Sequence, residues 1–329
     1  MNNAVFALHL LPDNVRLQVI KNFDHLHLIS FSLISSKSKA LVQSFNVKIE
    51  NLTVSVRGSL RIRIKPTVER FEIAFTIYQN YHTRGPVRKL KSLGYVASYV
   101  LVEADINEQR VAFELQTPRL SFSEWFQHLR SMFKCDIDQI IFNDVHEIYN
   151  TVALRSLLPQ WRSLEIDRSS HDFAQRILDV FCPCVKVIEA RIDINLQELP
   201  QKVSIQNLDS ITVGKPFTLD DALVFNAVEI SLISFTVSDV NRFLRSWVRG
   251  SNPRMRSANI LILGIPNREK LLKGITHQVT PVDQMLDEHG RVRERITIRN
   301  KKGIQATLKR NSSHTQYSQT YLLDYPVGN

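Results

Sequence analysis

The chain has 329 residues, long enough for two domains, and 43% of them are hydrophobic, enough for a sizeable core. Three cysteines exclude a fold held together by disulfides and indicate a reducing compartment. No segment reaches the roughly 18 apolar residues of a membrane helix, and the N-terminus has no secretory signal pattern. We therefore expect a cytoplasmic or nuclear protein without a membrane partner.

The net charge of +10 is unevenly distributed along the chain. Residues 251–329 carry 13 basic and 6 acidic side chains, whereas the charges of residues 47–250 nearly cancel. A uniform basic face for nucleic acid would show a more even excess. We therefore do not expect nucleic acid as the main partner, although a nucleic-acid-binding protein that uses the basic C-terminus is an alternative.

The first 46 residues are predicted to form short helices. Pro12 suits the first position of a helix, because its missing N–H would have no partner there. The next apolar residues follow helical spacing. They are Val15, Val19, Ile20 and Phe23. The segment has more apolar surface than a module of ~40 residues buries by itself, so we expect it to rest on a partner or on the rest of the chain.

After residue 46 the apolar residues alternate with polar ones, which predicts half-buried antiparallel strands. Gly58 marks the first turn, and the polar residues 79–92, with Gly85-Pro86, are predicted to form a loop. The predicted strands are residues 47–56, 60–65, 71–75, 95–103 and 110–116.

From residue 121 helices and strands alternate, beginning with a helix that Ser121 or Ser123 caps and that ends near Phe133. Six strands share one apolar spacing and recur roughly every 24 residues, a period typical of leucine-rich repeats. These strands begin at Ile137, Trp161, Val185, Leu208, Phe225 and Ser257. The helices between them are expected at about 171–182, 218–226 and 236–249. We predict an irregular, leucine-rich-repeat-like α/β stack, with a plain α/β sheet domain as the alternative.

Residues 291–325 are predicted to contain a β-hairpin that turns at Asn300-Lys301-Lys302-Gly303 and caps the stack. Its Lys and Arg side chains are interpreted as the solvated face of an edge hairpin, where they discourage sheet pairing. The predicted fold is mixed, α+β or α/β. Its expected domains are helices over residues 1–46, a β-rich segment over 47–120, and the stack with its hairpin over 121–329.

No catalytic constellation is visible in the sequence. A glycine-rich phosphate loop, a nucleophile elbow and a zinc-binding helix motif are all missing. Cys182 and Cys184 flank Pro183 and are interpreted as small buried residues at a helix end rather than as metal ligands. The three tryptophans lie among apolar neighbours and are assigned to the core. We therefore expect no enzyme activity, no metal and no cofactor.

The N-terminal segment resembles the F-box, a three-helix motif that docks on the Skp adaptor of Skp–cullin–F-box ubiquitin ligases. The resemblance begins with Leu11-Pro12-Asp13-Asn14-Val15 and continues through the apolar residues to Lys37. It implies a partner surface made of ten residues. They are Leu11, Pro12, Val15, Val19, Ile20, Phe23, Leu28, Leu33, Ile34 and Lys37.

The remainder resembles the nematode family of F-box proteins with a type 2 F-box-associated domain. The resemblance is carried by residues 161–170, 205–213, 218–221 and 240–253, above all by Trp247 followed by Gly-Ser-Asn-Pro. It implies a non-catalytic substrate-recognition subunit that links the Skp adaptor, and through it a cullin scaffold, to a protein substrate. An F-box scaffold that does not lead to ubiquitination is the alternative.

The predicted stack also suggests a substrate-binding face. Side chains alternate along a strand, so the residue between the two apolar residues of each strand centre points away from the core. Repeat proteins commonly bind partners on such surfaces, and three of these residues are glutamates, so we expect an acidic surface for a basic substrate segment. The predicted residues are Glu165, Glu189, Thr212, Glu229 and Leu261, with Ile141 equivalent in the first strand. A row of merely solvated strand positions is the alternative.

Overall fold

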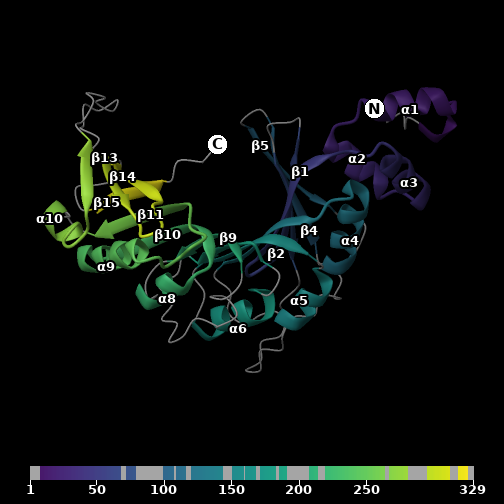
Figure 1. Ribbon diagram of the computed structural model, residues 1–329. Coiled ribbons are helices and arrows are strands. Elements are labelled where there is room, and N and C mark those ends of the chain that lie inside the picture. Colours follow the sequence, from purple (N-terminus) through teal and green to yellow (C-terminus); the bar gives the residue numbers. More distant parts are fainter. Residues whose placement is uncertain are drawn as a thin grey trace. The chain divides into compact units, whose positions relative to one another are not determined.

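The computed structural model describes residues 8–67, 72–78, 99–106, 109–115, 120–143, 150–158, 160–167, 171–182, 185–190, 207–213, 219–263, 267–280, 295–311 and 318–324 (Figure 1). The chain divides into two compact units, residues 1–138 (unit 1) and residues 139–329 (unit 2). The expected boundaries at residues 46/47 and 120/121 both fall inside unit 1. No helix in these ranges is long and apolar enough to cross a membrane.

Unit 1 begins with the predicted short helices. They are η1 (Leu8–Leu10), α1 (Asp13–Lys21), α2 (His25–Ser32) and α3 (Ser36–Ser44). Side chains fix two of the starts, because Asp24 accepts a hydrogen bond from the His27 N–H and Ser35 accepts one from the Ser38 N–H. Pro12 lies one residue before its expected position, at the N-cap of α1, where its missing N–H also costs nothing.

Five antiparallel strands follow in sequence order. They are β1 (Ile49–Val56), β2 (Leu60–Pro66), β3 (Ile73–Tyr78), β4 (Tyr99–Ile106) and β5 (Gln109–Leu115). The two-residue alternation is confirmed in β2, where Leu60, Ile62 and Ile64 are buried and Lys65 is exposed. Gly58, where a turn was predicted, lies in a bend between β1 and β2, and the loop predicted at 79–92 lies outside the described residues.

Helix α4 (Phe122–Phe133) joins the N-terminal helices to this sheet. Ser121 and Glu124 form a capping box at its start. Of the two predicted caps, Ser121 and Ser123, the first is therefore confirmed. Trp125 of α4 is fully buried, with its ring centroid 5.5 Å from that of Phe75 in β3. On its other side, α4 places His128 Nε2 2.7 Å from Ser32 Oγ in α2. The helices and the sheet therefore share one packed unit.

Unit 2 alternates strands with helices. Its first six strands are β6 (Ile137–Asn143), which begins in the last two residues of unit 1, β7 (Trp161–Asp167), β8 (Val187–Ala190), β9 (Leu208–Val213), β10 (Ala227–Phe235) and β11 (Ser257–Leu263). They neighbour one another in sequence order, and the pairs from β7 to β11 are parallel. A mixed α/β fold is thus confirmed, whereas the likeness to leucine-rich repeats stays a prediction.

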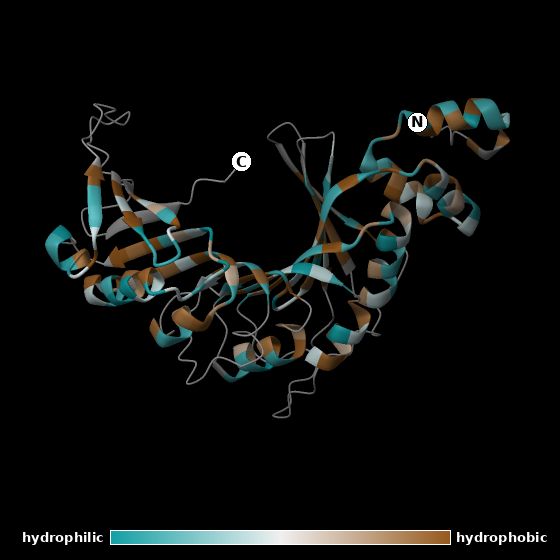
Figure 2. Ribbon diagram, in the orientation of Figure 1, coloured by the Kyte–Doolittle hydropathy of each residue, from teal (hydrophilic) through white to brown (hydrophobic). Residues whose placement is uncertain are grey.

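The helices of unit 2 lie on one side of these strands, as Figure 1 shows for the four longest. They are α5 (Thr151–Leu157), α6 (His171–Phe181), α8 (Leu219–Val224) and α9 (Val237–Val248), followed by the short α10 (Arg268–Leu271). Helices α6, α8 and α9 were predicted, whereas α5 was missed because its seven residues show less than two turns of apolar spacing. In Figure 2, β10 and β11 are largely hydrophobic, as expected for strands that helices cover.

Four antiparallel strands complete unit 2. They are β12 (His277–Thr280), β13 (Arg295–Arg299), β14 (Gln305–Asn311) and β15 (Ser318–Asp324), in the order β12-β13-β14-β15-β11. The predicted hairpin is β13–β14, and its turn contains Gly303 with a φ of +80°. The interpretation as an edge hairpin is wrong, because β12 and β15 pair with its outer sides.

Candidate protein-interaction surfaces

The N-terminal helices expose apolar side chains that their own core does not use. Leu10 is 76% exposed and Ile34 is 73% exposed, and Val15 is also exposed. Pro12 and Lys37 of the predicted partner surface are exposed as well. Leu10 was missed by the sequence analysis, because its apolar neighbour Leu11 fitted the motif and nothing in the pattern distinguishes the two.

Other residues of the predicted partner surface lie inside the module. Ile20 is 0% exposed and Leu28 is 6% exposed, so these two side chains hold the helices together and offer a partner almost no surface. A helical pattern gives apolar spacing but does not tell a core-facing residue from a partner-facing one, which is why both were assigned to the surface. The half-buried residues are Leu11, Val19, Phe23 and Leu33.

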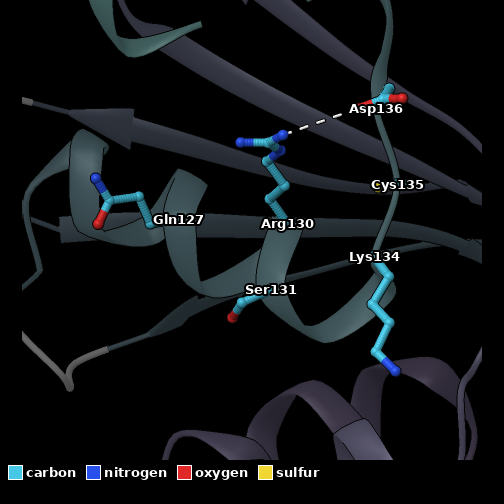
Figure 3. Close-up of a pocket in the computed structure, with 6 residues that line it drawn as sticks. All are labelled: Gln127, Arg130, Ser131, Lys134, Cys135 and Asp136. Carbon is cyan, nitrogen blue, oxygen red and sulfur yellow. Dashed lines mark ion pairs between the residues drawn. The ribbon is translucent and has the colours of Figure 1, made fainter. Parts of the chain in front are cut away.

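A small pocket lies at the C-terminal end of α4 (Figure 3). It has a volume of about 370 Å³ and is lined by Gln127, Arg130, Ser131, Lys134, Cys135 and Asp136. Arg130 and Asp136 form an ion pair at 3.8 Å. Burial raises the pKa of the Cys135 thiol to about 11, so this cysteine is a protonated thiol rather than a nucleophile at neutral pH. The pocket therefore holds no thiolate nucleophile at Cys135.

A metal site was not expected from the sequence. Across the part of the chain that the structure describes, no three His, Cys, Asp or Glu side chains are grouped to hold a metal ion. Cys182 is buried at the end of α6, as predicted, while Cys184 lies outside the described residues. Trp125, Trp161 and Trp247 are all buried, which confirms their assignment to the core.

The second face of the β6–β11 sheet, opposite the helices, carries polar side chains. The strand register places Glu165 of β7 beside Glu189 of β8, and Glu189 beside Thr212 of β9. All three are half-buried. Gln139 of β6 donates a hydrogen bond to Glu165 Oε2 at 2.9 Å, so the row begins with an amide. The predicted alignment of these three strands is confirmed.

The predicted alignment is wrong from β10 onwards. Thr212 lies beside Ser231, and Ser231 lies beside Asn259, so Glu229 and Leu261 are each two residues away from the row. The cause is that Ile230, not Val228, pairs with the buried Ile211. The sequence spacing was counted from Phe225, which precedes β10 and is buried outside the sheet register.

A shift of two residues keeps a side chain on the same face of a strand. Glu229 and Leu261 therefore stay on the polar face, where Glu229 is exposed and Leu261 is half-buried. Ile141, equivalent in β6, is almost completely buried rather than solvated. On the described strands β6–β11, the ionisable side chains of this face are all carboxylates. They are Glu165, Asp167, Glu189 and Glu229.

The string Trp247-Val-Arg-Gly-Ser-Asn-Pro has a structural reason at each key position. Gly250 has a φ of +105°, which side chains rarely adopt, and its N–H caps the Trp247 carbonyl at 2.8 Å. Asn252 has a φ of +50° and is buried, and its amide donates to the carbonyls of Ala222 and Phe225. The string thus ends α9 and ties it to the end of α8.

Comparison with known protein families gives one match in unit 1 and one in unit 2. A family model described as "F-box domain" matches residues 8–50, which hold η1 and α1–α3. A model described as "F-box associated" matches residues 199–260, which hold β9, α8, β10, α9 and most of β11. The Gly-Ser-Asn-Pro loop lies inside the second match.

One similar protein is "F-box associated domain-containing protein sdz-33" from Caenorhabditis elegans, which is 25% identical over 148 residues. The alignment covers 43% of this chain and 45% of that relative, so it spans less than half of either. No solved structure matches the chain.

F-box domains are protein-interaction modules that generally bind the Skp adaptor, and both matched modules are typically non-catalytic. The two resemblances seen in the sequence are confirmed by these matches. With an F-box match at residues 8–50 and an F-box associated match at residues 199–260, the chain is similar to nematode F-box proteins that carry an F-box associated domain.

Proposed function

We propose that this protein is a non-catalytic substrate-recognition subunit of a Skp–cullin–F-box ubiquitin ligase, at work in the cytoplasm or nucleus. The observation that carries the proposal is the exposed apolar surface of the F-box, with Leu10 and Ile34 largely in solvent. Large apolar side chains do not stabilise a module while they stay in water, whereas their burial against a partner is favourable. The Skp adaptor is the partner class that F-boxes generally bind.

The adaptor contact is tested with the double variant Leu10→Ala/Ile34→Ala in a pull-down with the Skp adaptor. Apolar anchors typically cost ~2 kcal/mol or more when truncated, so we expect binding to fall about 30-fold or more. Both residues are exposed, so the melting temperature should hardly change.

Two controls separate the contact from folding. Val152→Ala/Val224→Ala truncates two comparably exposed apolar residues of unit 2 and should leave adaptor binding intact. Ile20→Ala removes a buried side chain, so it should lower stability by about 2–5 kcal/mol and affect binding only through unfolding. Full adaptor binding by Leu10→Ala/Ile34→Ala would refute the assignment of this surface.

Unit 2 is proposed to hold the protein to be ubiquitinated, and the polar sheet face is its proposed binding surface. The residues concerned are Glu165, Glu189, Thr212, Glu229 and Leu261. Glu165 and Glu189 are neighbours across two strands, and the ionisable side chains of this face on the described strands β6–β11 are all carboxylates. Opposite charges attract, which supports a basic segment of a client as the partner.

The sheet face is tested by Glu165→Lys/Glu189→Lys, followed by affinity purification of the chain with proteasomal degradation blocked. We expect a specific client to be lost while the adaptor stays bound. Glu229→Lys reverses a charge two residues out of the row and should have the smaller effect. An unchanged set of clients in the double variant would exclude this face as the binding surface.

An F-box scaffold without ubiquitination differs from this proposal in one outcome. If the chain recruits clients for degradation, depleting it should raise the abundance of the clients that it binds. Clients that bind but do not accumulate on depletion would favour the scaffold.

A further inference from the structure

The end of α9 gathers basic side chains from three separate elements of unit 2. Arg245 and Arg249 come from α9 and its C-cap, Lys273 follows α10, and Lys301 and Lys302 form the β13–β14 turn. All five are exposed, and we call them the basic cluster. The side chains of these five make no ion pair or hydrogen bond with any residue that the structure describes.

Hydrogen bonds to backbone carbonyls hold the three elements together. The Lys301 N–H donates to the Val248 carbonyl of α9 at 2.9 Å. Asn241 of α9 donates to the carbonyls of Leu271 and Lys273, at 2.8 and 3.0 Å, which fixes the segment after α10 against the helix. The cluster is therefore a property of the fold rather than of long side chains that happen to approach one another.

Two basic side chains lie over glycines next to other members of the cluster. A Cβ placed on Gly250 would come within 2.6 Å of Lys301 Cε, so the stem of Lys301 packs on the glycine that follows Arg249. A Cβ placed on Gly274 would come within 3.9 Å of Arg245 Nε, so Arg245 lies beside the residue after Lys273. These contacts connect all three elements through their charged side chains.

The turn that carries the two lysines is rigid. Asn300 Oδ1 accepts hydrogen bonds from the N–H groups of Lys302 and Ile304, at 3.0 and 2.9 Å. The Gly303 N–H donates to the Asn300 carbonyl at 2.9 Å. A surface that is ordered before binding loses less conformational entropy when a partner arrives.

Two structural roles that would explain the cations do not apply. Basic residues at a helix end often cap the last carbonyls, but in α9 those carbonyls already accept backbone N–H groups. The carbonyls of Arg245, Ser246, Trp247 and Val248 pair with Arg249, Ser251, Gly250 and Lys301, respectively. Protection of a sheet edge fails as well, because β13 and β14 are paired on both sides.

Neutralisation by nearby acids is also weak. Among the described residues of α9, α10 and the turn, the acids are Asp239 and Glu269. Asp239 is occupied at the other end of α9, where it accepts from Thr236 in the capping box. Glu269 is a single exposed carboxylate, so the local charge remains strongly positive.

We propose that the basic cluster binds an acidic segment of a partner protein. Guanidinium and ammonium groups bind carboxylates through charge-assisted hydrogen bonds, and the cluster offers both. Ile304, exposed beside the two lysines, adds an apolar contact that a peptide side chain uses. Single-stranded nucleic acid is disfavoured, because none of the large exposed apolar side chains that the structure describes is an aromatic platform for bases. The proposal rests on the assignment of unit 2 as the client-binding part.

The test uses the full chain copurified with the Skp adaptor and a fluorescent glutamate–serine repeat peptide, with anisotropy as the readout. We expect saturable binding that Lys301→Glu/Lys302→Glu weakens about tenfold or more, a loss of roughly 1.4 kcal/mol or more. A glutamine–serine peptide should not bind. Arg162→Glu/Lys186→Glu makes the same charge change at exposed residues of β7 and the β8 approach, and it should leave binding intact.

A second variant protects the test against a folding defect. Lys273→Glu/Lys302→Glu leaves the packing of Lys301 on Gly250 untouched and should weaken the peptide to a similar degree. Equal binding of the two peptides, or no effect of either variant, would overturn the proposal. The proposal would also be overturned if duplex DNA, single-stranded RNA or anionic vesicles bound more tightly than the glutamate–serine peptide. Copurification with the Skp adaptor tests the proposed function independently of the peptide. The substituted lysines lie outside the F-box, so the variants should still copurify with the adaptor.

Discussion

The F-box of unit 1 and the basic cluster of unit 2 present two kinds of binding surface. The F-box exposes apolar residues within one short stretch of sequence, whereas the basic cluster unites residues 245–302 through three elements. Apolar burial gives affinity that depends little on salt, and charge gives selectivity and a faster approach. The difference suits the proposed role, in which the subunit stays on one adaptor and exchanges its clients.

The largest effects should come from mutations that disrupt the core of one unit and leave the other unit folded. Trp125 and Trp247 are both buried, one in α4 of unit 1 and one in α9 of unit 2. Either Trp→Ala change should cost about 3–5 kcal/mol, because it leaves a large cavity. Trp125→Ala should weaken adaptor binding, since α4 supports α2 through His128, while Trp247→Ala should abolish peptide binding at the basic cluster.

Urea unfolding together with both binding assays checks this separation. Each variant serves as the control for the other, because the same substitution is made in the other unit. If Trp247→Ala removed adaptor binding, or Trp125→Ala removed peptide binding, the two surfaces would not act independently.

Local patterns predicted most of the secondary structure, because short-range physics determines it. The alternation of Leu60, Ile62 and Ile64 predicted β2, and the oxygen of Ser121 predicted the start of α4. The F-box was recognisable for the same reason, since its residues are close in sequence. The buried state of Ile20 and Leu28 was not predictable, because it depends on how the helices pack.

Long-range geometry was the part that the sequence did not reveal. The register of β9 and β10 depends on which residues the helices bury, so a count from Phe225 missed it by two residues. Arg245 and Lys273 gave no signal, because the contacts that join α9, the segment after α10 and the β13–β14 turn exist only after these elements have packed together. Both failures concern contacts between residues far apart in the chain.

Salt should distinguish the two surfaces with an effect of intermediate size. Between about 50 and 200 mM salt, the acidic peptide should lose about tenfold or more in affinity, because exposed charges are screened within a Debye length of ~10 Å. Adaptor binding through Leu10 and Ile34 should change by less than about twofold, because apolar contacts carry no charge to screen. Titrations of both ligands against the same preparation measure the two dependences. If peptide binding and adaptor binding weakened equally with salt, the assignment of one surface as charged and the other as apolar would be contradicted.

The smallest expected effect concerns the pH dependence of the contact between α2 and α4. Burial, with a smaller contribution from the nearby charge of Lys39 in α3, lowers the pKa of His128 to about 4. The buried Ser32 hydroxyl donates to the Ile29 carbonyl at 2.6 Å, so its oxygen accepts from the neutral His128 ring. The contact therefore needs no charge on the histidine.

The sign of the pH effect follows from proton binding. The ordinary pKa of histidine, 6.5, applies to the unfolded chain, so between about pH 6.5 and pH 4 the unfolded state binds more protons than the folded state. The stability of unit 1 should thus fall as the pH drops through this range and should be insensitive to His128 above about pH 7. Partial exposure of the ring moderates the size of the effect.

Two variants test this assignment through urea unfolding from pH 4 to pH 7. His128→Gln keeps an N–H donor for Ser32 but cannot titrate, so it should flatten the pH dependence. Lys39→Gln removes the positive charge that opposes protonation, so the pKa of His128 should rise towards its ordinary value and the destabilisation at low pH should shrink. An unchanged slope in His128→Gln would assign the acid sensitivity of unit 1 to other groups, because no other property of the contact changes with proton binding.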